Sequence, residues 1–158
     1  MRLKSTIIII MILSLVLVSC TNSNAGTKLE GEITTMEGEI TFYVANDDLT
    51  SWAKYNKEID GDLINIIEQL KLDEKSFIPK DTKVLDIDIK DGIAYINLSS
   101  EFDTPESNAS TPASYKIKSI VKTLCLNKKL EINGVRFLIN GEYVDSIGPI
   151  LTEGIIKD

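Results

Sequence analysis

The chain has 158 residues, no histidine, and 24 acidic against 17 basic side chains, which gives it a net charge of −7. This length suits one modest domain. An acidic protein repels nucleic acid and anionic membrane surfaces, so nucleic-acid binding is excluded. The lack of histidine removes the commonest general base and metal ligand, and neither a metal nor a cofactor is expected.

The N-terminus, residues 1–19, is predicted to be a lipoprotein signal peptide. Arg2 and Lys4 precede an apolar core at 7–18, which is too short to cross a bilayer comfortably. The core ends at Ser19-Cys20, a pattern that resembles the bacterial lipobox. We therefore expect lipidation of Cys20 and a lipid anchor at the extracytoplasmic face of the cell membrane. An ordinary signal peptide that happens to contain a cysteine is the alternative.

Residues 21–28 are small and polar without periodicity, and a flexible tether is predicted over 20–37, followed by a single domain over 38–158. Apolar residues alternate along 39–45, which is typical of a strand. Residues 51–59 fit a second, irregular strand. A helix is then predicted over 62–71, with a cap from Asp60-Gly61-Asp62, because apolar residues recur there with helical spacing at Leu63, Ile66, Ile67 and Leu70.

Residues 84–99 carry the clearest structural signal, two alternating runs on either side of Asp91-Gly92. Asp-Gly favours a type I′ hairpin turn, because both central residues of that turn need positive φ. A two-residue turn places Asp88 opposite Tyr95. One face of the hairpin is then apolar and consists of Leu85, Ile87, Ile89, Ala94, Ile96 and Leu98. We expect the helices to cover this face.

The remaining chain predicts a loop, a helix and a second hairpin. Residues 99–111 are rich in Ser, Pro, Asn and acids, which indicates a mobile loop. Thr111-Pro112 is typical of a helix N-cap followed by proline at the first helical position, and this helix should end near residue 126. A strand at 135–139 and a turn at Asn140-Gly141 follow. The order predicts an α+β fold, with two helices on one face of a small, mostly antiparallel sheet.

The same residues resemble the GerMN domain of bacterial sporulation and spore-germination lipoproteins over 40–148. The most specific part is D-G-I-A-Y-I-N-L-S-S-E-F at 91–102, which is similar to a family pattern Asp-Gly-x-Ala-x-Val-Asp-Leu-Ser-x-Glu-Phe. Four other segments match in order, at 41–44, 78–82, 120–124 and 135–141. The chain departs from the family at Lys71-Leu72, where a Gly-Pro often stands.

The resemblance implies an extracytoplasmic protein of sporulation, germination or cell-envelope assembly, with a fold similar to the ring-building modules of sporulation channel proteins. It implies envelope or sporulation proteins as partners, or self-association, and no catalytic residues. A peptidoglycan- or glycan-binding module is the alternative, with Trp52 and Tyr55 as a sugar-stacking platform and the loop at 99–111 as a further candidate region. An unrecognised hydrolase is a third possibility.

Several patterns have the spacing of catalytic or metal sites, and a structural interpretation is favoured for each. Ser119 and Lys122 have the Ser-x-x-Lys spacing of penicillin-interacting enzymes, but the companion motifs are missing. Asp86, Asp88 and Asp91 are similar to a calcium loop, but the hairpin would disperse their carboxylates.

Acidic pairs such as Glu101 and Asp103 are interpreted as loop residues rather than as the paired carboxylates of a glycosidase. Cys125 is predicted to be a buried small apolar residue. Asp88 and Tyr95 are interpreted first as a cross-strand pair. The candidate interaction residues are therefore Trp52, Tyr55, Asp88, Tyr95 and Glu101.

Overall fold

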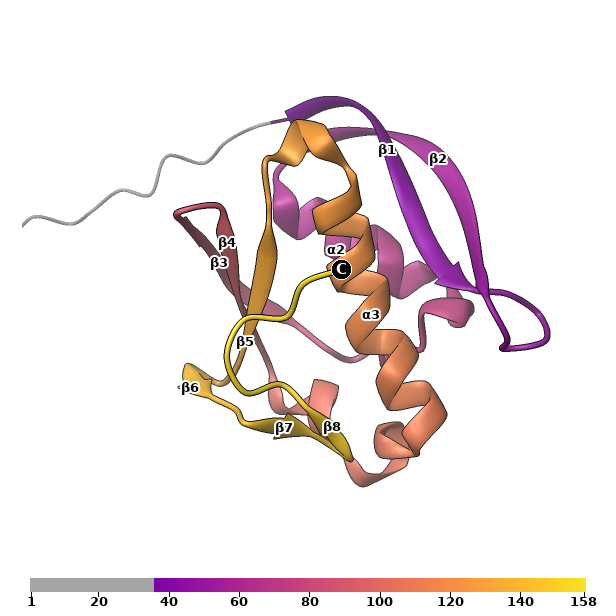
Figure 1. The fold of residues 1–158 in the computed structure, drawn as a ribbon, viewed down its shortest axis with the longest axis vertical. Coiled ribbons are helices and arrows are strands. Elements are labelled where there is room, and N and C mark those ends of the chain that lie inside the picture. The colour runs from indigo at the N-terminus through magenta and orange to yellow at the C-terminus, as the bar shows by residue number, and fades with distance from the viewer. Residues whose placement is uncertain (1–35) are drawn as a thin grey trace, which may run out of the picture. The chain divides into compact units, whose positions relative to one another are not determined.

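Eight strands and two α-helices follow one another in the computed structural model, which describes residues 36–158. The α+β class and the order of elements as far as β6 confirm the sequence prediction (Figure 1). The predicted signal peptide, the tether up to residue 35, and Cys20 lie outside the described residues. Within the described part of the chain, no helix has the length and apolar character needed to cross a membrane.

The strands form three sheets. The first pairs β1 (Met36–Ala45) with β2 (Trp52–Gly61). The second has the order β3-β4-β5-β6, and consists of Val84–Lys90, Ile93–Leu98, Gly134–Ile139 and Glu142–Tyr143. The third pairs β7 (Ser146–Ile147) with β8 (Ile150–Leu151). β1 begins slightly before the expected start of the domain at residue 38, and β2 is a regular antiparallel partner rather than an irregular strand.

The fold has two α-helices: α2 (Leu63–Leu72) joins the first sheet to the second, and α3 (Ser110–Leu126) joins β4 to β5 within the second sheet. The cap of α2 lies in the predicted segment 60–62 and is Asp62, whose side chain accepts a hydrogen bond from the Asn65 N–H at 3.1 Å. The predicted Thr111 cap of α3 is wrong, because the helix begins at Ser110 and its cap residue is Ala109. Pro112 still lies in the first turn, where backbone N–H groups have no partner within the helix.

The β3–β4 hairpin has the predicted register from the turn as far as Asp86, and Asp91 and Gly92 both have positive φ. An irregularity then shifts the pairing, so that Val84 rather than Leu85 lies opposite Leu98. Leu85 is 46% exposed, and Ile89, beside the turn on an edge strand, is 43% exposed. Their predicted place in the core is therefore wrong, and a bulge explains the displacement of Leu85.

The segment between the hairpin and α3 is ordered as short 3-10 turns, η2 (Ser100–Asp103) and η3 (Pro105–Asn108), so the predicted mobile loop is wrong. Phe102 is fully buried, with its ring 6.0 Å from that of Phe137 between centroids. The Lys116 ammonium, also fully buried, donates to the Phe102 carbonyl, the Ser107 hydroxyl and the Asn108 side-chain carbonyl. Contacts distant in sequence therefore order a polar segment.

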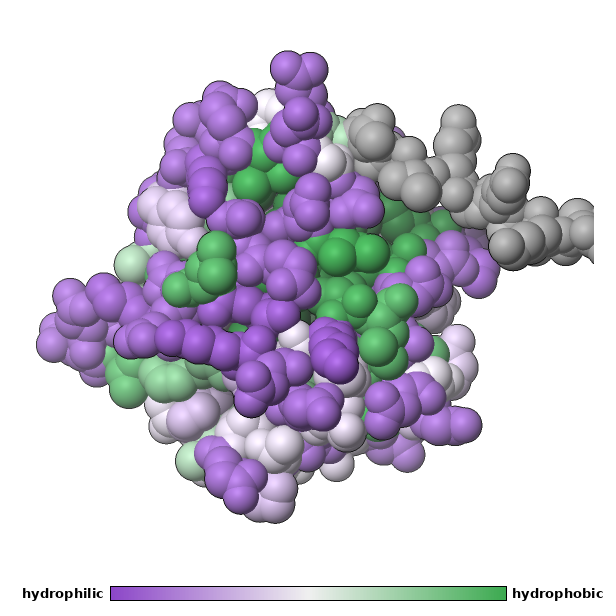
Figure 2. All heavy atoms as spheres, turned by 180° about the vertical axis from the view of Figure 1, so that it is seen from behind, coloured by the Kyte–Doolittle hydropathy of each residue, from purple (hydrophilic) through white to green (hydrophobic). Residues whose placement is uncertain are grey.

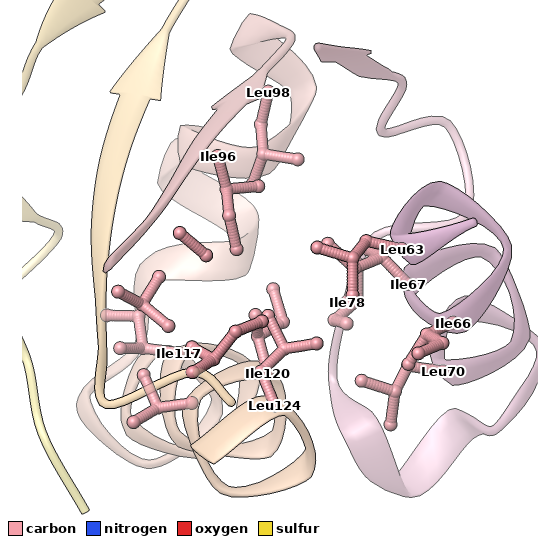
Figure 3. Packing of buried hydrophobic residues seen from close by; sticks show 14 of the residues in the cluster. Leu63, Ile66, Ile67, Leu70, Ile78, Ile96, Leu98, Ile117, Ile120 and Leu124 are labelled. Carbon is pink, nitrogen blue, oxygen red and sulfur yellow. The ribbon is translucent and has the colours of Figure 1, made fainter. Parts of the chain in front are cut away.

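The hydrophobic core lies where the two helices meet the inner faces of the sheets. In Figure 3 the apolar side chains of α2 point toward those of α3 and β4. The contributing residues are Leu63, Ile66, Ile67 and Leu70 from α2, Ile117, Ile120 and Leu124 from α3, and Ile96 and Leu98 from β4. Ile40, Phe42 and Val44 of β1 also belong to the cluster. Each such buried side chain stabilises the fold by about 1.5–3 kcal/mol.

Candidate interaction surfaces

Trp52, at the start of β2, packs against α3. Its ring centroid lies 4.9 Å from that of Tyr115, and the Lys122 ammonium lies 5.4 Å from the Trp52 ring centroid. The side chain is only partly exposed. Trp52 therefore fastens the end of the β1–β2 ribbon to α3, and its ring is not a free platform for a sugar.

Tyr55 lies further along β2, where its ring stacks on the buried ring of Phe42 at 5.2 Å between centroids. Burial, with the nearby charge of Asp73, raises the pKa of the Tyr55 hydroxyl. Tyr55 also lines an open groove of about 480 Å³ between β2 and the end of α2. The other lining residues are Lys57, Gln69, Leu72, Asp73, Glu74 and Lys75, and Leu72 is 71% exposed.

The outer edge of β1 is sealed by side chains of α3 and of the residue that follows it. The Asn127 side chain accepts from the Thr41 N–H at 3.0 Å and donates to the Thr41 carbonyl at 2.8 Å. The Thr123 hydroxyl accepts from the Tyr43 N–H at 3.1 Å. These contacts occupy the outward backbone groups of Thr41 and the N–H of Tyr43, which blocks the addition of a further strand along the middle of β1.

The outer edge of β2 is open. In an antiparallel pair, residues opposite each other point their backbone groups alternately toward and away from the partner strand. Thr41 and Tyr43 point away from β2, so their partners Asn56 and Lys54 point away from β1. Among the described residues, β2 pairs only with β1. The outward backbone groups of Lys54 and Asn56, which flank the groove residue Tyr55 in sequence, are therefore available to another strand.

The second predicted group, Asp88 and Tyr95, is a cross-strand pair on the β3–β4 hairpin, as expected. Lys90 forms an ion pair with Asp88, and its ammonium lies 5.8 Å from the Tyr95 ring centroid. The structure adds Arg136, which lies beside Tyr95 because β4 and β5 pair in parallel. Sequence analysis missed Arg136. Its position was a sign of a possible functional role, because a basic residue stands there between the apolar Val135 and Phe137 of a predicted strand.

Tyr95 and Arg136 line a shallow pocket of about 260 Å³ with Tyr143, Gly154 and Ile155, which we call the tyrosine–arginine pocket. The Arg136 guanidinium donates to the carbonyls of Thr152 at 2.7 Å and Gly154 at 2.8 Å. Its central carbon lies 5.2 Å from the Tyr143 ring centroid. The guanidinium is thus fixed in place beside a tyrosine that is 61% exposed.

Glu101 is exposed on η2 and is not among the lining residues of the groove or the pocket. A hydrogen bond with the Ser99 side chain holds the pKa of the Glu101 carboxyl below its ordinary value. Ser119 is buried with an unpartnered hydroxyl, whereas Lys122 forms an ion pair with Asp158. The Ser-x-x-Lys spacing therefore produces no hydrogen-bonded pair. Across residues 36–158, no cluster of cysteine and carboxylate side chains has the arrangement of a metal site.

Cys125 is partly buried and packs against the core, close to its predicted environment. Burial raises the pKa of its thiol.

A family model described as Germane, sporulation and spore germination, matches residues 41–145. The chain belongs to the Germane family of GerMN domains. This match contains the second half of β1, from residue 41 onward, all of β2, and the groove beside β2. The part of the tyrosine–arginine pocket formed by Gly154 and Ile155 lies beyond it.

Solved structures share the fold of this GerMN domain. The first GerMN domain of the sporulation protein GerM from Bacillus subtilis is 22% identical, with a TM-score of 0.54, and the match covers 75% of this chain and 92% of that one. The tandem GerMN domains of the same protein are 16% identical, with a TM-score of 0.52. That match covers 86% of this chain and 49% of the tandem structure, so the present chain spans about half of the tandem.

A Clostridium perfringens protein described as a lipoprotein is 24% identical over 85% of this chain and 93% of that one, with a TM-score of 0.48. No curated protein matches the chain.

Proposed function

We propose that this chain is a lipoprotein, anchored through Cys20 at the outer face of a bacterial cytoplasmic membrane, whose GerMN domain assembles with envelope or sporulation proteins. The role is one of binding, without catalysis. The observation that supports it is the contrast between the two edges of the β1–β2 ribbon. One edge is sealed by Asn127 and Thr123, and the other is open beside a groove.

An extended partner segment suits such an edge. Its backbone would form hydrogen bonds with the outward groups of Lys54 and Asn56, while alternate side chains enter the groove beside Tyr55 and Leu72. Backbone pairing supplies much of the affinity in this mode, and the groove supplies the specificity. The surface shows hydrophobic patches among hydrophilic residues (Figure 2), which is also compatible with binding to another protein.

A photo-crosslinking amino acid at position 54 tests this function in sporulating cells. We expect it to form a discrete adduct with another protein chain, because Lys54 lies on the open edge. The same group at Lys118, an exposed residue of α3, is the matched control. Equal adducts from both positions, or none from position 54, would contradict binding at the β2 edge.

The anchor has its own test. Cys20→Ala is expected to release the protein from the membrane or to leave the precursor unprocessed, because lipidation requires the thiol. Membrane fractionation and the mass of the mature chain measure this outcome. Cys125→Ser is the control and should fractionate as the wild type does. Unchanged fractionation and mass for Cys20→Ala would show that Cys20 carries no anchor.

A second candidate function, peptidoglycan binding, is favoured by the tyrosine–arginine pocket. Tyrosine rings stack on sugars, and a fixed guanidinium suits the carboxylates of a wall peptide. We expect Tyr143→Ala to abolish co-sedimentation of the protein with purified cell wall, whereas Trp52→Ala should leave it unchanged, because the Trp52 ring packs on Tyr115. Loss of wall binding in Trp52→Ala alone would instead place the glycan at β2.

A further inference from the structure

The sequence immediately before β1 repeats the first half of that strand. Residues 30–34 read E-G-E-I-T, and residues 37–41 read the same. An apolar residue precedes each copy, Leu29 in one case and Met36 in the other. The second copy forms part of β1, so this short sequence is a strand where the structure describes it.

The strand has two distinct faces. In β1, Ile40 is buried and Met36 is partly buried, whereas Glu37 and Glu39 are exposed. The first copy carries the same alternation, because Leu29, Gly31 and Ile33 stand at one set of positions and Glu30 and Glu32 at the other. It is thus a sequence with an apolar face and an acidic face, suited to the edge of a sheet.

The first copy of the repeat has no favourable place in its own domain's ribbon. If it replaced the second copy in the pairing with β2, Phe42 and Val44 would leave the core, and losing a buried Phe alone costs about 3–5 kcal/mol. Reaching the outer edge of β2 means crossing two strand spacings, about 9.6 Å. Only Thr35 lies between the repeat and β1, and the two residue steps from position 34 to position 36 span at most about 7.2 Å, which is too short.

Charge selects β2 over β3 as the strand that would accept the repeat. Both strands lie at sheet edges. β3 carries Asp86 and Asp88 on the face opposite its apolar residues, and Lys90 is already paired with Asp88. Lys54 of β2 is exposed and has no ion pair within residues 36–158. Glu58 and Asp60 follow on the same face of β2, so an acidic strand is attracted only at the Lys54 end of that strand, whereas at β3 it meets Asp86 and Asp88.

We propose that residues 29–34 of one copy add as a third strand to the open edge of β2 in a second copy. Leu29 and Ile33 then face the groove beside Tyr55 and Leu72, and Glu30 and Glu32 lie on the face of Lys54. The inference rests on the proposed assembly function and names its partner as this chain itself. Each copy carries one donor segment and one acceptor edge, so copies associate reciprocally or in a continuing series.

Disulfide trapping tests this contact in the full-length, lipidated protein, reconstituted in phosphatidylglycerol–phosphatidylcholine vesicles. Two differently tagged forms are mixed, both with Cys125→Ser, one with Glu32→Cys and the other with Lys54→Cys. Neighbouring strands bring such positions within the distance that a disulfide requires, so mild oxidation should give a mixed-tag dimer. The repeat supplies a matched control, Glu39→Cys, which occupies the equivalent position inside β1 and should give no such dimer.

Two further variants measure the strength of association by sedimentation of the same lipidated protein in detergent. Ile33→Pro removes strand pairing at a position outside the described domain, with Asn24→Pro as its control. Lys54→Glu replaces attraction by repulsion. We expect each to weaken association about tenfold without changing the melting temperature.

Equal trapping by Glu39→Cys and Glu32→Cys, or wild-type association of Ile33→Pro, would overturn the self-assembly. Adducts of position 54 with a different envelope protein, without trapping at position 32, would overturn it and leave the proposed function intact. If position 54 forms no adduct with any protein and the Glu32→Cys and Lys54→Cys forms give no mixed-tag dimer, both the self-assembly and the proposed binding at the β2 edge are overturned.

Discussion

Lys116→Met is expected to lower the free energy of unfolding by about 3 kcal/mol, because it leaves buried acceptors without a donor. The Lys116 ammonium holds Phe102, Ser107 and Asn108 together and lies 4.9 Å from the Phe102 ring centroid. Its removal should also increase hydrogen exchange in η2 and η3. Urea unfolding measures the change, with the exposed Lys118→Met as the control. Equal stability of the two variants would show that Lys116 is not what orders the segment.

The same residue predicts a dependence on pH. Burial lowers the pKa of Lys116 to about 8, against the opposing influence of the Asp103 charge, whereas a lysine in an unfolded chain has a pKa of about 10.4. Between these values the unfolded chain binds more protons than the folded one, so the stability contributed by Lys116 rises with pH. Below about pH 8, Lys116 is charged in both the folded and the unfolded chain, and this gain in stability is absent. We expect the deficit of Lys116→Met, measured by urea unfolding, to widen from about pH 8 to about pH 10. A constant deficit would contradict this.

Asn127→Ala should cost about 2–3 kcal/mol, because the side chain acts as a substitute strand along β1. Its amide exchanges two hydrogen bonds with the backbone of Thr41 and donates a further bond to the Thr123 carbonyl. The side chain is 9% exposed, so water would satisfy these groups poorly.

Thermal unfolding measures the effect of Asn127→Ala, with the exposed Asn133→Ala as its control. The variant should also associate at the newly opened β1 edge, which sedimentation would detect. A stable, unassociated Asn127→Ala protein would show that the amide does not seal the strand.

Local patterns were sufficient to predict α2 and the β3–β4 turn. Asp62 and the apolar spacing after it identify a helix within ten residues, and Asp91-Gly92 fixes a turn whose two residues must both adopt positive φ. Where the same residues fit several local structures, the sequence did not decide between them. Pro112 fits several positions of a first turn, so it indicated the start of α3 without locating its cap.

Features that depend on distant contacts could not be predicted. Residues 99–111 have the composition of a loop, and only their packing around Lys116 and Phe102 orders them. The neighbour of β4 is β5, which arrives after a long helix, so no local pattern placed Arg136 beside Tyr95. Tyr95 was identified as a candidate, whereas the pocket that surrounds it was not. Tyr55 was likewise identified without its groove, since α2 supplies the other wall.

The parallel pairing of β4 with β5 has a consequence for how this domain folds. The strands of the β1–β2 and β3–β4 ribbons are joined by short turns. β4 and β5 are separated in the chain by the whole of α3, so they can pair only after this long segment has folded back on the core. Closing so long a stretch of chain is slow because its entropy is lost before the contacts form. We therefore expect the apolar strand β4 to remain unpaired on one side until late in folding. During that interval the nascent domain is most exposed to aggregation and proteolysis.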